Sequence, residues 1–173
     1  MKFASFGRQT DRNHIIRYVS DPEAQILLLE MTDAVHDLND GVGDVDQFIS
    51  RVRDVLHSRF GGARENALML LSRVARYHPE CNVIWRELMQ SPSWQMRFAV
   101  ACRLYWHVPE DLSDRFFAIL RNDKSKRVRE IAVSRYENRA DENGEIVIGR
   151  YDAAKFDDRV RRGELKIIGE AEF

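Results

Sequence analysis

The residues of this chain best suited to binding chemistry are basic side chains that gather in one short run. From Arg121 to Arg129 the sequence holds five basic residues and a single acid, Asp123. The run falls where a turn is expected to lead into a helix, and the first N–H groups of a helix attract anions. It predicts a docking point for phosphate or for an acidic partner. A solvated turn without a ligand is the alternative interpretation.

Two further arginine positions recur at a spacing of 32 residues. Arg103 and Arg135 are separated by this distance and are expected on successive helices. With Arg73 they form either a basic stripe or a set of arginines buried beside carboxylates. Arg97 and Arg129 show the same spacing.

The tryptophans divide into core and surface positions. Trp94 follows Pro92 at the start of an expected helix, so we expect it to be exposed, whereas Trp85 and Trp106 are expected in the core. The candidate binding residues are therefore Trp94, Arg97, Arg103, Arg121, Lys124, Lys126, Arg127 and Arg135.

The sequence offers no set of catalytic, metal or cofactor residues. It contains no G-x-S-x-G element, no Walker loop and no H-E-x-x-H pair. Cys81 and Cys102 lie in apolar surroundings outside any C-x-x-C pair, so we expect buried free thiols. We therefore expect a non-enzymatic protein with no metal and no cofactor.

The elements that position these residues repeat along the chain. The spacing of 32 that relates the arginines also pairs Phe116 with Ile84 and Leu120 with Leu88. Self-similarity at a period of 20–50 residues is typical of stacked repeats. Each unit has the apolar periodicity of two helices. The sequence predicts a mostly α-helical fold, a short α-solenoid of about three antiparallel helix pairs.

Three segments follow from this periodicity. Residues 1–46 hold an N-terminal helix that begins at Asp21 and an acidic loop, residues 47–139 hold the repeats, and residues 140–173 form a tail. In the tail we expect two short β segments, Glu145–Gly149 and Leu165–Gly169, around a short helix, and we expect the tail to cap the stack.

Charge is distributed unevenly over these segments. The formal net charge is −1, which argues against a general nucleic-acid binder. Asp21–Asp46 holds eight acids and no Lys or Arg, whereas Arg64–Arg139 holds 14 basic and 9 acidic residues. The acidic segment would suit a basic partner. The sequence has no apolar stretch long enough for a membrane span and no signal peptide, so we expect a cytoplasmic protein.

The turn residues of the repeats carry a resemblance to a known family. Asp123-x-x-x-x-Val128-Arg129-x-x-Ala132-Val133 resembles the HEAT and HEAT-like (armadillo-type) repeat, and Met96-Arg97-x-x-Val100-Ala101 is a looser copy. Ser91 stands where the family has Asp. The resemblance implies that Arg97 and Arg129 tie neighbouring turns together, through carbonyls or an acidic residue. It also implies that the second helices line the concave side.

The resemblance leaves several functions open. The first is a protein-interaction module, an adaptor, scaffold or antidote-like (immunity) protein whose partner and oligomeric state are unknown. The second is nucleic-acid binding, since Ser93-Trp94-x-x-Arg97-x-x-Val100 is superficially similar to a segment of HEAT-like DNA glycosylases. The third is a lyase-like role toward a bound pigment or cofactor, which no Cys or His element supports.

Overall fold

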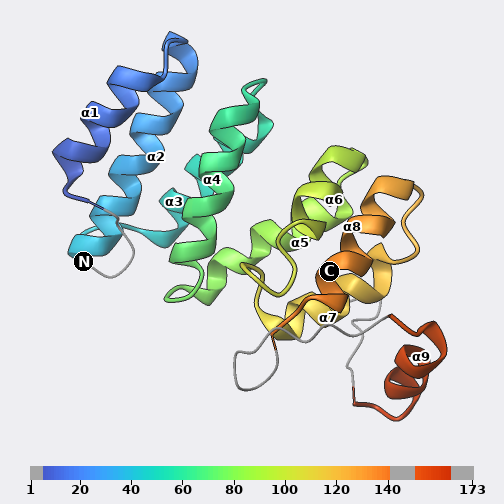
Figure 1. Ribbon diagram of the computed structural model, residues 1–173. Helices are drawn as coiled ribbons and strands as arrows, with labels where there is room; N and C mark the ends of the chain where they lie inside the picture. The colour runs from blue at the N-terminus through green and yellow to red at the C-terminus, as the bar shows by residue number, and fades with distance from the viewer. Residues whose placement is uncertain (1–5, 141–150, 165–173) are drawn as a thin grey trace. The chain divides into compact units, whose positions relative to one another are not determined.

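The chain is mostly helical, as the periodicity predicts. The computed structural model describes residues 6–140 and 151–164, and these form nine α-helices and one short 3-10 helix (Figure 1). They divide into two compact units, Met1–Ile84 and Trp85–Phe173. The division falls inside the region 47–139 for which we expect repeats. The expected β segments in the tail lie outside the described residues.

Unit 1 consists of helices that run alongside one another (Figure 1). They are α1 (Arg8–Tyr18), α2 (Pro22–Asp40), α3 (Val45–His57) and α4 (Gly61–Val74), followed by the 3-10 helix η1 (Pro79–Asn82). Helix α2 packs against α1, α3 and α4 and supplies the centre of the core with Leu28, Met31 and Val35. Helices α3 and α4 form the first helix pair that the sequence predicts.

Helix α2 begins and ends where the sequence predicts. The Asp21 side chain accepts hydrogen bonds from the N–H groups of Glu23 and Ala24, at 3.0 and 3.2 Å, as expected of an N-cap residue. Gly41 ends the helix with a φ of 75°, a conformation that glycine adopts without steric cost. A Cβ at Gly43 would lie 2.6 Å from the Leu38 nitrogen, so the close return of the loop requires glycine there.

Helix α1 has no counterpart in the sequence prediction, because it lacks an apolar stripe. None of its residues is buried. Ion pairs hold it instead: Arg8 contacts Asp37 at 2.6 Å and Asp40 at 3.2 Å, and Arg12 pairs with Asp33. Helix packing here rests on charge, which a search for hydrophobic periodicity does not detect.

Unit 2 contains the second and third helix pairs. Its helices are α5 (Val83–Gln90), which begins just before the unit boundary, α6 (Trp94–Ala101), α7 (Glu110–Leu120), α8 (Lys126–Glu137) and α9 (Ala153–Arg161). Helix α6 packs against α7 and α8, and α7 packs against α8 (Figure 1). Residues 32 positions apart are buried alike. Val100 and Ala132 are both fully buried, and Leu104 is fully buried while its counterpart Tyr136 is 7% exposed.

An aromatic cluster attaches α9 to the other helices of unit 2. Phe156 is 1% exposed and its ring lies edge-on to Phe117, Tyr136 and Tyr151, with centroids 5.0 to 6.2 Å apart. The short helix predicted in the tail is therefore confirmed. It covers α7 and α8 with aromatic side chains.

The second helix of the second pair is shorter than the sequence predicts. We expect it to extend to Trp106, but α6 ends at Ala101. The chain then turns through Tyr105, whose φ of 63° is unusual for a residue other than glycine. The Tyr105 N–H donates to Ser113 Oγ at 2.9 Å and its hydroxyl donates to Asp114 at 2.9 Å, which fixes this conformation.

Candidate binding surface

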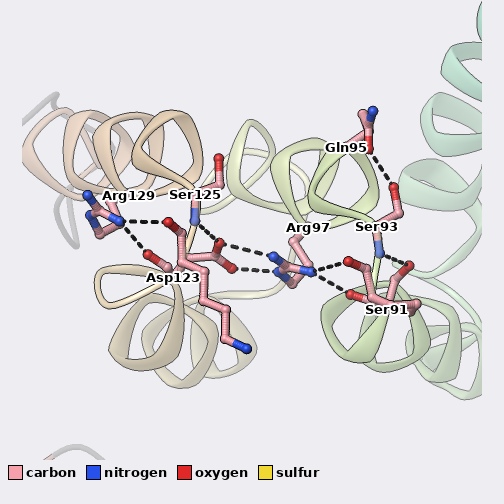
Figure 2. Close-up of polar contacts among 9 residues, drawn as sticks. Ser91, Ser93, Gln95, Arg97, Asp123, Ser125 and Arg129 are labelled. Atoms are coloured by element: carbon pink, nitrogen blue, oxygen red, sulfur yellow. Dashed lines mark hydrogen bonds and ion pairs between the residues drawn. The ribbon is translucent and has the colours of Figure 1, made fainter.

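An ion pair between Arg97 and Asp123 connects two turns of unit 2 (Figure 2). Arg97 Nε lies 2.5 Å from one carboxylate oxygen and Nη2 lies 3.1 Å from the other, the bidentate geometry that makes such pairs strong. The side chains are 16% and 6% exposed. Hydrogen bonding to Arg97 lowers the pKa of Asp123 below its usual value, and the same contact raises the pKa of Arg97. Arg97 is thus engaged within the protein.

The contacts of Arg97 recur at Arg129 (Figure 2). Arg97 Nη1 donates to the backbone carbonyls six and five residues earlier, at 2.6 and 3.1 Å. Arg129 Nη1 donates to the carbonyls at the same two positions before it, again at 2.6 and 3.1 Å. Both arginines therefore brace the turn that precedes their own helix. A contact to a neighbouring turn, which the family resemblance implies for both arginines, is made by Arg97 through Asp123.

The turns also share a hydrogen bond from a backbone N–H to a side chain. The N–H of the residue before α4, α6 and α8 donates to the side chain two positions earlier, at 3.3, 3.2 and 2.8 Å respectively. The accepting side chains are Ser58, Ser91 and Asp123. A serine and an aspartate fill the same place because either oxygen can accept this bond, but only the aspartate can also bind an arginine.

The ion pair of Arg97 does not recur at Arg129. Among the described residues, no carboxylate binds Arg129, and the residue 32 positions after Asp123 is Lys155. Arg97 thus has both carbonyl and carboxylate partners, whereas Arg129 has only the carbonyls within residues 6–140 and 151–164.

Two other candidate arginines are internal as well. Arg121 donates to the Tyr151 hydroxyl, pairs with Asp157, and lies 4.7 Å from the centroid of the Phe156 ring. It fastens α9 to α7. Arg103 is 9% exposed and donates to the Ala99 carbonyl at 2.9 Å. The structure therefore does not give Arg103 and Arg135 the shared exposed stripe, and burial is the outcome for Arg103.

Two arginines of α8 lie against tryptophans. The guanidinium carbon of Arg135 is 4.4 Å from the centroid of the Trp106 ring, and that of Arg127 is 5.6 Å from the Trp94 ring. Both distances allow a cation–π interaction. Nε of Arg135 is buried and makes no hydrogen bond to a residue that the structure describes. Within the described part of the chain, the contact recorded for this guanidinium is the Trp106 indole.

The expectation that Trp106 belongs to the core is wrong. Its side chain is 54% exposed, whereas Trp85 is fully buried as expected and Trp94 is partly exposed. The turn at Tyr105 ends the helical register that would have carried position 106 inward. Sequence reasoning missed Trp106 as a surface residue because it assumed a continuous helix. Similarly, Cys81 is buried but Cys102 is only half-buried.

The two arginine–tryptophan pairs and two neighbouring lysines define one surface, which we call the α6–α8 face. Lys124 is exposed and contacts no acid among residues 6–140 and 151–164, and Lys126 makes only an exposed contact of 3.6 Å with Glu130. Such an exposed pair contributes little. The α6–α8 face consists of Trp94, Trp106, Lys124, Lys126, Arg127 and Arg135.

Most acids of Asp21–Asp46 have roles within unit 1. Asp33, Asp37 and Asp40 hold α1 through Arg8 and Arg12. Glu23 and Glu30 contact Arg59 and Arg51, at 3.2 and 3.1 Å. Asp21 and Asp44 cap the helices that follow them. The sequence pattern did not indicate these internal roles.

Nothing in the described chain points to a metal or a membrane span. Within residues 6–140 and 151–164, no three His, Cys, Asp or Glu side chains are grouped so that they could hold a metal ion. No helix of that part is both long and apolar enough to cross a membrane.

Comparison with family models, with curated proteins and with solved structures finds no match for this chain.

Proposed function

We propose that the chain is a non-enzymatic, HEAT-like module that binds another protein through the α6–α8 face. The observation that carries this proposal is the pair of arginine–tryptophan contacts on α8. Arg127 and Arg135 lie against tryptophans and, like Lys124, have no carboxylate partner among the described residues, whereas five acids of Asp21–Asp46 are paired with arginines of unit 1. Tryptophan and arginine are also the residues most enriched in binding hot spots.

The recurring turn contacts support the HEAT-like part of the proposal. Helices α4, α6 and α8 begin at residues 61, 94 and 126, close to the 32-residue period, and the turns before α6 and α8 share the same arginine–carbonyl bonds. We propose that the helix pairs stack as a short solenoid and that the tail caps it. In a cytoplasmic setting, such a module acts as an adaptor, a scaffold or an antidote to its partner.

Nucleic-acid binding is the second candidate, because base stacking on tryptophan beside arginine is a recognised mode of single-strand binding. The specific likeness to glycosylases is weakened by Arg97. Its guanidinium is bound to Asp123 and to two carbonyls, so it has little left for a lesion.

An affinity purification at low salt from the source cell, with and without nuclease, tests the proposal. The tagged chain should retain one stoichiometric protein after nuclease treatment. That protein, purified separately, should bind the wild-type chain and bind the R127E/R135E variant more weakly. Recovery of nucleic acid alone, with no protein left after nuclease, would replace the proposal with the second candidate.

A further inference from the structure

The positions of Arg127 and Arg135 on α8 define the spacing of the charges that a partner of the α6–α8 face must present. Arg127 and Arg135 are eight residues apart on α8, which corresponds to a rise of about 12 Å and a rotation of about 80°. Both therefore project from one side of the helix. Each lies against an indole, at 5.6 and 4.4 Å.

Stacking on an aromatic ring leaves the edge of a guanidinium available. A planar guanidinium that rests on an indole directs its N–H groups sideways, and these match a carboxylate in bidentate fashion. A side chain held in this way loses less rotamer freedom on binding than a free arginine does. The two arginines are thus partly ordered before a partner arrives, and no acid among the described residues occupies them.

The surroundings favour carboxylates on a protein over the phosphates of a nucleic acid. A nucleic-acid site usually makes many phosphate contacts, but the α6–α8 face has four cations. Glu130 lies between Arg127 and Arg135 in sequence and is 63% exposed, so a continuous run of phosphates would meet a negative charge. Two separate carboxylates avoid this repulsion, and Trp106 provides apolar area beside one of them.

We propose that the occupant of the α6–α8 face is an acidic protein segment with two carboxylates about 12 Å apart, bound by Arg127 and Arg135. In a helix this spacing corresponds to acids about eight residues apart, and in an extended strand to acids about four residues apart. Trp106 packs against the apolar part of the segment. The inference rests on the proposed function and names the chemistry of its partner.

The test uses a phage-displayed library of random 16-residue peptides, selected on the immobilised full chain. Selected peptides are then synthesised with a fluorescent label and their binding is measured by anisotropy at two salt concentrations. We expect enrichment of paired acids at one of the two spacings. R127E and R135E should each weaken binding about tenfold or more, the loss of one charged bidentate contact.

Three controls make the result specific. K155E has the same change in charge on an 85% exposed side chain of α9 and should leave binding unchanged. W106F should bind more tightly than W106A, because it keeps part of the ring. Circular dichroism of each variant verifies that the helices remain.

Each other outcome would overturn the inference. Failure to enrich acidic pairs, or selected peptides that bind R127E/R135E as well as wild type, would remove the acidic partner from this face. Tighter binding of a labelled 20-nucleotide oligothymidine than of any peptide, lost in R127E/R135E, would assign the face to nucleic acid. If R127E/R135E weakens binding of the purified protein partner, but the segment of that partner that binds here carries no pair of acids at either spacing, the proposed function stands and only this inference fails.

Discussion

Replacing Asp123 with Ala should reduce the free energy of unfolding of unit 2 by about 3 kcal/mol. The carboxylate accepts two hydrogen bonds from Arg97, at 2.5 and 3.1 Å, and one from the Ser125 N–H, at 2.8 Å. A hydrogen bond to a charged group contributes about 1.5–3 kcal/mol, and the turn bond from the Ser125 N–H adds about 1 kcal/mol. The Arg97–Asp123 pair is largely but not fully buried. We therefore take the lower end of the range for the bond to the charged group and add the contribution of the Ser125 bond.

Asp123→Ser is the matched variant, because the protein itself uses serine at the equivalent position of the preceding turn. Ser91 accepts the same turn bond, from the Ser93 N–H at 3.2 Å, but cannot form the ion pair. D123S should therefore keep the turn bond and lose about 2 kcal/mol of unfolding free energy, between wild type and D123A.

Tryptophan fluorescence during urea unfolding is the appropriate assay. All three tryptophans belong to unit 2, so the signal reports this unit selectively. With an m-value of about 1 to 1.5 kcal/mol per molar, D123A should lower the urea midpoint by about 2 to 3 M. A double-mutant cycle with R97A isolates the coupling between the two side chains, expected at about 1–3 kcal/mol.

The same pair makes a prediction about pH. The pKa of Asp123 is lowered in the folded state, so its stabilisation is present above the ordinary Asp value and is lost as pH falls through the folded pKa. The difference in free energy of unfolding between wild type and D123S should therefore disappear in acid. The reasoning is refuted if the cycle gives no coupling energy, or if the advantage of wild type is unchanged from pH 7 to pH 2.

Three further predictions concern other parts of the chain. Because Arg8 and Arg12 hold α1 through partly exposed ion pairs, 1 M NaCl should accelerate amide exchange in α1 far more than in α2; equal rates at low and high salt would contradict this. Burial raises the pKa of Cys81 to about 12, so iodoacetamide should label it only in denaturant, and labelling of the native chain at pH 8 would disprove its burial. Phe156→Ala should cost about 3–5 kcal/mol and expose α9 to limited proteolysis, with unchanged cleavage as the contrary result.

The helix pairs could be predicted from sequence because apolar residues recur with the helical period. Phe48, Val52, Leu68 and Leu71 are all buried where the pattern places them. The starts of helices were also predictable, since Asp21 and Ser93, the residues immediately before α2 and α6, are of the types that commonly precede a helix.

The candidate site was predictable only in part. A sequence pattern predicts where an arginine lies on a helix, but it does not predict which carboxylate or aromatic ring that arginine contacts. Arg97, Arg121 and Arg127 look alike in sequence, yet Arg97 and Arg121 are bound to Asp123 and Asp157, and Arg127 rests on a tryptophan. Which carboxylate reaches which arginine depends on tertiary distances. The exposure of Trp106 was not predicted because the sequence did not indicate the left-handed turn at Tyr105.

The direction of the Arg97–Asp123 contact has a consequence for how the repeat can multiply. The arginine precedes α7 and the aspartate follows it, so the segment from Asp123 to Arg129 carries an acceptor toward the preceding helices and, at Arg129, a second arginine with the same carbonyl contacts. Tandem duplication of this segment with its helices would supply a complete new pair at the added junction without further mutation. In the present chain Lys155 stands 26 residues after Arg129, the spacing that separates Arg97 from Asp123. A designed helix pair with an aspartate at that spacing can therefore add a second contact of the same kind.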